Sequence, residues 1–396
     1  MTEAIPSSWL SQRLGDVVTL SRGIDLPVQN RSEGVCPVVG SNGVVGYHSS
    51  SAVQGPGVLV GRSGSVGEVA YIEEDYWPLN TTLYVKDFRG NYPRFISYFL
   101  RHLDLGRFTG GVSVPTLNRN ILHKLEVWLP PVSEQRAIAS VLHAVQRAKE
   151  ARQRELALEC ERKDALMEHL FTHGTCGEAT KPTPIGEVPE SWSLATLESL
   201  YETQLGKMLS QKAHTGVNAK PYLRNANVQW GTVNVTDLYE MDFNEAEQEK
   251  FLLKEGDLLI CEGGEIGRSA IWKAELPECY FQKAIHRARP RSTDVVPEFL
   301  RYWMEWGFRV ADVYGVTGTQ TTIAHLPQEK LAQMRIPNPQ KSVQKEMAAA
   351  FSACDTVIRT VQKEITLLDE LFAALLQELM TGELRCDALL GGVTIQ

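Results

Sequence analysis

The sequence has no long apolar run. No stretch reaches the ~18 to 20 uncharged apolar residues that cross a bilayer, and the opening residues, MTEAIPSSWLSQ, lack the basic patch and apolar run of a secretory signal peptide. These absences exclude the membrane class. We therefore expect a cytoplasmic protein with no membrane partner.

Cysteine and histidine are too few and too scattered to build a covalent or metal framework. The seven cysteines lie at 36, 160, 176, 261, 279, 354 and 386 and are never spaced CxxC, and the nine histidines form no HExxH motif. An odd, dispersed set argues against a disulfide scaffold and a structural zinc site. We expect reduced, mostly buried thiols and no metal site.

Catalytic motifs are also missing. The chain has no G-x-x-x-x-G-K-[ST] phosphate loop and no FxGxG-like cofactor loop, and Asn338-Pro339-Gln340 is the nearest approach to the Asn/Asp-Pro-Pro-aromatic motif of amino-methyltransferases. GRSGSVG around Ser65 comes close to the G-x-S-x-G elbow of hydrolases, but Ser63 stands where its first glycine belongs and the related loop has Glu265 at the place of Ser65. A glycine-turn hairpin explains both loops better, and we expect a non-catalytic chain.

What the chain does have is globular composition with an uneven charge. Its 396 residues are 43% hydrophobic, which fits two or three folded domains. The net charge of −8 would usually argue against nucleic acid. The acidic excess lies wholly after residue 173, however, so composition permits a DNA-facing surface without predicting one.

The chain consists of two copies of one plan. IPSSWLSQRL (5–14) matches VPESWSLATL (188–197), and GVLVGRSGSVGEVAYI (57–72) matches DLLICEGGEIGRSAIW (257–272). LHKLEVWLPPVSEQRAIASVL (122–142) then matches LAQMRIPNPQKSVQKEMAAAF (331–351), and this last register continues without a gap to Thr172 and Thr381. A doubled order of this kind predicts a pseudo-two-fold molecule.

Each copy begins with a globular part and ends in a long helix. Short apolar runs between glycine turns predict mixed α/β domains at 1–132 and 191–341. Long helices are predicted at 133–173 and 342–382, with Ser133 and Ser342 as N-caps. A Pro/Gly/Thr-rich linker at 174–190 and a tail at 383–396 complete the chain.

The second helix has an uninterrupted apolar seam. Its members follow one another in alternating steps of four and three, which is the 3.5-residue repeat of a coiled coil: Met347, Phe351, Cys354, Ile358, Val361, Ile365, Leu368, Phe372, Leu375 and Leu379. The first helix has this seam only toward its ends, at Ile138, Leu142, Val145, Leu156, Leu166 and Leu170. Lys149, Arg152, Glu159 and Lys163 occupy its middle, which we interpret as a locally hydrated or stutter-containing stretch.

Chain order sets the direction of helix pairing. The first helix leads out of domain one and into domain two, while the second leads out of domain two, so the two helices pair antiparallel. The predicted fold class is α+β: two mixed α/β domains joined by two long antiparallel coiled-coil helices in a pseudo-two-fold repeat. Helix faces left uncovered would bind partner subunits, and the seam residues are the candidates for that interface.

Several loops are rich in side chains that hydrogen-bond to base edges or phosphates. They are RFTGGVSVPTLNRN (107–120), VTGTQTTIAHLPQEK (316–330) and PYLRNANVQWG (221–231), together with the two glycine loops. The candidate DNA contacts are Arg62, Ser63, Ser65, Arg107, Thr109, Ser113, Asn118, Lys212, Arg224, Asn225, Asn227, Gln229, Arg268, Thr319, Gln320 and Thr321. Taken singly, each of these loops is more often a solvated turn than a DNA contact.

The doubled motifs resemble one known family. The helix starts LPPVSEQRAI and NPQKSVQKEM, the helix ends LFTHG and LMTG, and the IPSSW and VPESW openings are similar to those of the DNA specificity subunit of type I restriction-modification enzymes. The resemblance covers essentially the whole chain. It rests on the paired order of the motifs, because none of them is specific alone.

The resemblance implies a role in a restriction system that defends against phage. Each globular part would be a target recognition domain for one half of a bipartite site in double-stranded DNA, and the helices would set the spacing. Two modification (methyltransferase) subunits with S-adenosylmethionine would dock on the chain, and two restriction (ATP-dependent translocase and nuclease) subunits with ATP and Mg would join them. This chain would hold no cofactor.

The recognition domains differ outside their shared frame, which predicts an asymmetric site. VVGSNGVVGYHSS (38–50) has no evident counterpart in the second copy, where HTGVNAKPYLRNANVQWG (214–231) stands instead. Two alternatives remain open. One is the specificity subunit of an orphan methylation-only system, and the other is a coiled-coil adaptor without DNA specificity, which the acidic total charge favours.

Overall fold

The computed structural model describes residues 6–109, 115–209, 216–315 and 325–385. The chain divides into two compact units. Unit 1 comprises Met1–Gln153 and Gln362–Gln396, and unit 2 comprises Arg154–Val361. Each long helix therefore contributes one half to each unit, and the units are described in turn.

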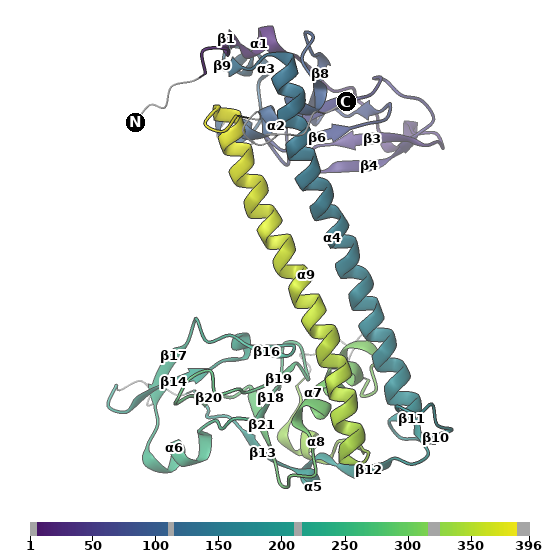
Figure 1. The fold of residues 1–396 in the computed structure, drawn as a ribbon, viewed down its shortest axis with the longest axis vertical. Coiled ribbons are helices and arrows are strands. Elements are labelled where there is room, and N and C mark those ends of the chain that lie inside the picture. The colour runs from purple at the N-terminus through teal and green to yellow at the C-terminus, as the bar shows by residue number, and fades with distance from the viewer. Residues whose placement is uncertain (1–5, 110–114, 210–215, 316–324, 386–396) are drawn as a thin grey trace. The chain divides into compact units, whose positions relative to one another are not determined.

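Unit 1 contains a four-stranded sheet in the order β2-β8-β5-β6, a three-stranded sheet in the order β4-β3-β7 and a ribbon of β1 and β9 (Figure 1). The strands are β1 Leu10–Arg13, β2 Thr19–Arg22, β3 Cys36–Gly40, β4 Gly43–His48, β5 Gly57–Gly61, β6 Val69–Ile72, β7 Trp77–Pro78, β8 Thr82–Asp87 and β9 Glu126–Leu129. The helices are α1 Leu14–Val17, η1 Val28–Asn30, α2 Pro93–His102, η2 Leu105–Phe108, α3 Arg119–Leu122, the first half of α4 Val132–His173 and the second half of α9 Lys341–Thr381.

The core of unit 1 forms between the four-stranded sheet and α2. Strand β5 is buried along its whole length, which is why it is apolar without alternation. Helix α2 begins with Pro93 at its first turn, where the missing N–H costs nothing, and buries Phe95, Ile96 and Phe99. Leu379 at the end of α9 joins the same core.

Unit 2 repeats this plan with a four-stranded sheet β13-β21-β18-β19, a three-stranded sheet β17-β14-β20 and a ribbon of β12 and β22. Its strands are β10 Thr180–Thr183, β11 Gly186–Pro189, β12 Ser193–Thr196, β13 Tyr201–Leu205, β14 Ala219–Leu223, β15 Val228–Gln229, β16 Thr232–Val233, β17 Tyr239–Asp242, β18 Leu258–Cys261, β19 Ser269–Ile271, β20 Tyr280–Phe281, β21 Ile285–Pro290 and β22 Arg335–Asn338. Its helices are α5 Leu197–Leu200, η4 Asn225–Asn227, α6 Glu245–Phe251, α7 Pro297–Glu305, the π-helical turn η5 Trp306–Val310, α8 Gln328–Gln333, the second half of α4 and the first half of α9 Lys341–Thr381.

The three-stranded sheets of the two units are equivalent, which corrects one sequence prediction. Strand β3 pairs antiparallel with β4 and parallel with β7, and β14 pairs antiparallel with β17 and parallel with β20. VVG at 38–40 therefore has a counterpart in unit 2. Sequence comparison missed it because a two-residue turn joins β3 to β4, whereas residues 224–238 separate β14 from β17.

The predicted linker at 174–190 folds as part of unit 2. Strands β10 and β11 form a hairpin in register from Thr180↔Pro189 to Thr183↔Gly186. Ile185 and Val188 are buried in the core of unit 2, beside Phe171. The stretch thus covers the end of α4 instead of serving only as a connector.

Each long helix has a buried glutamine in its first turn. The main-chain N–H of Gln135 donates to the Pro131 carbonyl, and that of Gln344 donates to the Gln340 carbonyl. Ser133 and Ser342 therefore lie inside the first turn, so the prediction that they are N-caps is wrong. The glutamine side chains do the anchoring.

The two glutamine anchors share two hydrogen bonds, and Gln135 Nε2 also donates to Asn91 Oδ1 at 2.8 Å. Oε1 of Gln135 accepts from the Tyr92 N–H at 2.9 Å, and Oε1 of Gln344 accepts from the Val296 N–H at 2.9 Å. Their Nε2 atoms donate to the carbonyls of Pro130 and Pro339. The Ser-x-Gln motif thus ties each helix start to the helix that covers the sheet.

The apolar seam of α9 is confirmed. Its ten predicted members are buried or half-buried along the whole helix, and most positions between them are exposed. In unit 1, α9 runs antiparallel to α4, because Lys149 pairs with Asp369 and Arg152 pairs with Glu364. In unit 2 the same direction follows from the contact of Phe171 with Phe351 and of Lys163 with Asp355.

The seam of α4 departs from prediction in unit 2. Met167 and Phe171 are fully buried, whereas the predicted Leu166 and Leu170 are half-buried at the edge of the core. Lys163, Met167 and Phe171 follow in consecutive steps of four, which is how a stutter shifts a seam. Lys163 itself is 6% exposed, so the interpretation of the middle of α4 as hydrated is wrong at this residue.

The thiols are less buried than expected. Cys261, Cys279 and Cys354 are buried, Cys36 is half-buried, and Cys160 and Cys176 are exposed. These six are unpaired, and Cys386 lies outside the described residues. Within the same residues, no helix has a stretch apolar and long enough to span a bilayer.

Candidate nucleic-acid interface

The glycine loops of both units are hairpin turns, as predicted. The loop at 62–68 joins β5 to β6, and the loop at 262–268 joins β18 to β19. Gly64 and Gly67 have φ of +86° and +87°, and Gly264 and Gly267 have φ of +74° and +78°. These left-handed values strain any residue with a Cβ, so the repeated glycines preserve the loop shape.

In unit 1, the main chain of the glycine loop is held from two sides. The N–H groups of Arg62 and Ser63 donate to the Thr81 carbonyl at 2.8 and 3.2 Å, and the Arg62 carbonyl accepts from Leu117 N–H at 3.0 Å. These hydrogen bonds fix the main chain that carries the half-buried side chains of Arg62 and Ser63, which we call the rigid platform. Rigid presentation lowers the entropy cost of ordering side chains on a ligand.

Beside this platform lies a polar hollow of about 520 Å³, which we call the unit 1 polar hollow; it is lined by residues of 40–43, 59–70 and Thr82. Ser65 Oγ donates to Asn42 Oδ1 at 2.7 Å, which orients the Asn42 amide. Asn42 and Glu68 are both exposed at the hollow. The hollow combines an oriented amide, a hydroxyl and a carboxylate, the groups that pair with base edges.

Three further candidates of unit 1 lie on exposed segments. Arg107 and Thr109 are exposed, and the Arg107 guanidinium stacks 4.8 Å from the centre of the Phe108 ring. Asn118 is also exposed, but its side-chain oxygen accepts from Asn120 N–H and caps α3. Ser113 lies outside the described residues.

In unit 2, the side chains of two candidates form bonds within the fold. Asn227 is 3% exposed; its Oδ1 accepts from Arg224 N–H, and its Nδ2 donates to the carbonyls of Asn234 and Asp237. The burial of Asn227 argues against the DNA contact predicted for it. Arg224 pairs with Asp237 at 2.6 Å and stacks 3.6 Å from the centre of the Tyr239 ring, so it shapes the loop between β14 and β17.

Asn225 and Arg268 also form internal bonds. Asn225 Nδ2 donates to the Gly263 carbonyl at 2.8 Å, and Arg268 Nη2 donates to the Asn225 carbonyl at 2.9 Å. The Arg268 side chain is only 15% exposed, which argues against the phosphate contact predicted for it. Gln229 is exposed and remains a candidate, while Lys212, Thr319, Gln320 and Thr321 lie outside the described residues.

The two glycine loops carry reversed charges at equivalent places. Arg62 corresponds to Glu262 and Glu68 corresponds to Arg268. Glu262 is buried. Next to it, burial raises the pKa of the Cys261 thiol to about 11, so this thiol is not a nucleophile near neutral pH. The same backbone thus presents different chemistry in the two units.

Sequence reasoning passed over the turn between β3 and β4. Ser41 and Asn42 line the unit 1 polar hollow, and Asn42 bonds to Ser65 from the other loop. The signal was present in the sequence, because Ser-Asn-Gly between two valine pairs is typical of a hairpin turn.

Several of the helix seam residues predicted to contact other subunits pack in the cores of this chain. Phe351 is buried in the core of unit 2, and Phe372 and Leu379 pack in the core of unit 1. The same holds for Ile138 and Leu142, which are buried in unit 1. The remaining predicted members, Val145, Leu156, Leu166, Leu170, Ile358, Val361, Ile365, Leu368 and Leu375, are half-buried or buried.

Other apolar side chains of the helices are exposed. Leu158, Val357, Leu367 and Leu371 are 65%, 37%, 51% and 45% exposed. They lie off the seam, and they were missed because the search followed the seam period. Within the described residues, no group of three or more His, Cys, Asp or Glu side chains is placed to hold a metal ion.

The comparisons with known proteins agree with the two-unit plan. A family described as the type I restriction modification DNA specificity domain matches residues 6–159 and 189–369. The type I restriction enzyme MjaVIII specificity subunit of Methanocaldococcus jannaschii is 26% identical over 303 residues, covering 74% of this chain and 69% of that protein. The putative MjaX specificity subunit of the same organism is 21% identical over 302 residues, covering 74% of this chain and 68% of that protein.

Solved structures share the fold. The S subunit of a type I restriction-modification system from M. genitalium superposes with a TM-score of 0.64 at 15% identity, covering 96% of this chain and 97% of that chain. A chain from a study of complex assembly and conformational transition of the type I R-M system superposes with a TM-score of 0.60 at 15% identity, covering 96% of this chain and all of that one. Because the family match falls once on each copy of the repeat and together spans most of the sequence, this chain belongs to the type I restriction modification DNA specificity domain family.

Proposed function

We propose that the chain is the DNA specificity subunit of a type I restriction-modification system, with each unit reading one half of a bipartite, asymmetric site in double-stranded DNA. One observation carries the proposal. The two units keep the same glycine-hairpin frame and the same glutamine anchors but exchange the polar side chains on that frame, such as Arg62 for Glu262. A fixed frame with variable polar groups is what two readers of different sequences need.

In this function the remaining exposed groups divide by chemistry. Arg62 and Arg107 would hold phosphates, whereas Ser65, Asn42 and Gln229 would read base edges. The acceptor Asn42 Oδ1 is engaged by Ser65, so its amide N–H₂ is the group available for a base acceptor. Ser63 and Thr109 would support the loops beside them.

The chemistry of the system would reside in partner chains. We propose that two modification subunits with S-adenosylmethionine assemble on this chain and that two restriction subunits with ATP and Mg join them in the cytoplasm. The chain itself would catalyse neither methyl transfer nor cleavage.

The test is the methylated motif in host DNA. In cells that express the system, Asn42→Ala or Ser65→Ala should relax base choice within one half-site by ~1 to 3 kcal/mol per contact and leave the other half-site unchanged. Gln229→Ala should do the same for the opposite half-site. A methylation pattern that is not bipartite, or that survives deletion of this gene, would refute the proposal.

Binding assays separate phosphate contacts from base contacts. Arg62→Gln and Arg107→Gln, assayed with the modification subunits present, should weaken binding to all sequences and lower the salt dependence by about one counterion each. Equal binding of the assembled complex to its site and to random-sequence DNA would favour an adaptor without DNA specificity.

A further inference from the structure

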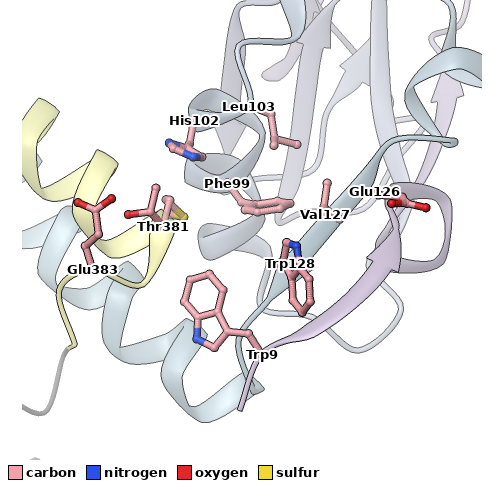
Figure 2. A pocket seen from close by; sticks show the side chains of 10 residues that line it. Trp9, Phe99, His102, Leu103, Glu126, Val127, Trp128, Thr381 and Glu383 are labelled. Carbon is pink, nitrogen blue, oxygen red and sulfur yellow. The ribbon is translucent and has the colours of Figure 1, made fainter. Parts of the chain in front are cut away.

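Unit 1 has another hollow, which is lined largely by aromatic and apolar side chains. It has a volume of about 390 Å³ and lies where α2, β9 and the end of α9 meet; we call it the aromatic hollow. Figure 2 shows Trp9, Phe99, Leu103 and Trp128 around it, with Glu126 and Glu383 at its rim. Trp128 is 43% exposed, which is unusual for so large an apolar side chain.

The internal repeat identifies the equivalent place in unit 2. Hydrogen bonds from Tyr92 and Val296 to the two glutamine anchors align α2 with α7. In that alignment Phe99 corresponds to Trp303, and Leu103 corresponds to Gly307.

The ribbons align in the same way. Leu10 pairs with Leu129 in unit 1, and Ser193 pairs with Asn338 in unit 2. Glu126 therefore corresponds to Arg335, which gives a second set of matching positions around the hollow.

In unit 2 this place is filled by one side chain, that of Tyr314. Trp303 Nε1 donates to the Tyr314 hydroxyl at 2.8 Å, and that hydroxyl donates to the Arg335 carbonyl at 2.9 Å. A Cβ at Gly307 would lie 3.2 Å from the Tyr314 ring. These three neighbours of Tyr314, whose ring also packs on Phe308, correspond to Phe99, Glu126 and Leu103, all of which line the aromatic hollow.

We propose that the aromatic hollow of unit 1 is a docking site for a tyrosine-like side chain of a protein partner. The ring would pack against Phe99, Leu103 and Trp128, and the hydroxyl would reach the Glu126 carbonyl as Tyr314 reaches Arg335. Buried aromatic anchors of this kind dominate the affinity of protein interfaces.

The charge at the rim of the aromatic hollow indicates which residues should flank the aromatic side chain of the partner. Glu126 and Glu383 are exposed carboxylates at the hollow. Burial, together with nearby Arg107, lowers the pKa of His102, so this histidine adds no positive charge near neutral pH. The acidic rim repels DNA phosphates and favours a peptide in which lysine or arginine flanks the aromatic residue.

Naming this partner as the modification subunit rests on the proposed function. Unit 2 fills its own hollow with Tyr314, so the docking contact would exist in unit 1 alone. Two modification subunits on one pseudo-symmetric chain would therefore be held by unequal contacts.

The first experiment uses p-cresol, the side-chain analogue of tyrosine, with the full chain. Saturation-transfer NMR should show p-cresol bound to the wild-type chain and lost in Leu103→Trp, which fills the hollow. The matched variant Tyr314→Ala should gain a second p-cresol site in unit 2. Binding only to Tyr314→Ala, and none to the wild type, would overturn the proposal.

The second experiment adds purified modification subunits. They should displace p-cresol from the wild-type chain, and Glu126→Arg, which copies the residue of unit 2, should weaken assembly about tenfold through its rim charge. If the complex forms and binds DNA while p-cresol stays bound, the docking assignment fails and the proposed function stands. If no complex forms, the proposed function fails, and the assignment of this partner fails with it.

Discussion

The α4–α9 contact is built differently in the two units, although the frame around it is the same. In both units a tyrosine of the covering helix reaches the long helix: Tyr98 donates to Gln146 Oε1 at 3.0 Å, and Tyr302 donates to Asp355 Oδ2 at 2.8 Å. Beside this shared bond, unit 2 has the buried Lys163 where unit 1 has the half-buried ring of Phe372.

In unit 2 the contact is a buried cluster of ion pairs, which we call the charge cluster. Lys163 lies 2.7 Å from Glu305 and 2.6 Å from Asp355, and Arg301 lies 3.1 Å from Glu305 and 2.8 Å from Asp355. Lys163, Arg301 and Glu305 are at most 6% exposed. Each charge has at least two partners of opposite sign, which is the condition under which buried charges are tolerated.

In unit 1, Phe372 takes the place that Lys163 has in unit 2. Its ring packs against Tyr98 at 5.9 Å between centres. The charged pairs of this unit lie outward: the side chains of Lys149 and Asp369 are 30% and 52% exposed, and those of Arg152 and Glu364 are 44% and 45% exposed.

The difference distinguishes the α4–α9 pairing of unit 1 from that of unit 2, although the two helices are related by the repeat. A phenylalanine in place of Lys163 would leave Glu305 and Asp355 with fewer cationic partners, and a lysine in place of Phe372 would lose the packing of that ring on Tyr98. The charge cluster therefore makes the two halves of the helix pair non-interchangeable, a role that buried polar groups are known to play in coiled coils.

The largest effect should come from breaking the charge cluster. Lys163→Ala leaves Glu305 and Asp355 buried with less compensation, so the free energy of unfolding of unit 2 should fall by ~3 to 5 kcal/mol. Amide hydrogen exchange of the α4 and α9 segments within unit 2 would measure it. A loss below that of a surface pair would show that the cluster is not tightly coupled.

The glutamine anchors should have similar effects, because both accept from the covering helix and donate to a proline carbonyl. Gln135→Ala and Gln344→Ala each strand a buried N–H and carbonyl group, and each should cost about 1 to 3 kcal/mol. Urea unfolding followed by hydrogen exchange in the matching unit is the measurement. Strongly unequal costs would contradict the equivalence of the two helix starts.

Acid should lower the free energy of unfolding of unit 2 more than that of unit 1. The loss should be smaller than that caused by Lys163→Ala. Burial alone would raise the pKa of Asp355, but Arg301 and Lys163 outweigh it and hold this pKa below its usual value. A lowered pKa contributes stability at pH above the unfolded value, and this is lost as pH falls through the folded value. Urea unfolding at neutral pH and below about pH 4 should show it in the wild type, and Asp355→Asn should remove this part of the pH dependence.

The smallest effect should come from the exposed pairs of unit 1. Lys149→Ala or Arg152→Ala removes a solvent-exposed ion pair, which contributes ~0.2 to 1 kcal/mol and is screened by salt. Unfolding in low and high salt would test this. A salt-independent loss as large as that of Lys163→Ala would erase the distinction between the two contacts.

Local patterns in the sequence were sufficient for much of the architecture. The glycine loops and the seam of α9 each depend on residues close together in the chain, and each is confirmed. The N-caps were wrong because Ser133 and Ser342 satisfy a local rule that the glutamine anchors override through bonds to distant residues.

The candidate site was less accessible to sequence reasoning. Asn227 and Arg268 have the chemistry of DNA contacts, but the loop between β14 and β17 uses them internally. Asn42 gains its orientation from Ser65, which lies 23 residues away. Residue type is visible in the sequence, whereas exposure and hydrogen-bond partners are not.

The sequence by itself determined the doubled plan, the helix seam and the family, because repeats and periodic burial are written in residue order. Only the tertiary structure decided the roles of the residues that depart from the repeat. Lys163 is buried among carboxylates, and Tyr314 fills a place that is open in unit 1. The structure also decided which polar groups stay exposed. Those outcomes depend on contacts that are distant or irregularly spaced in the chain, such as Lys163 with Asp355 and Tyr314 with Arg335, and such contacts produce no periodic pattern in the sequence.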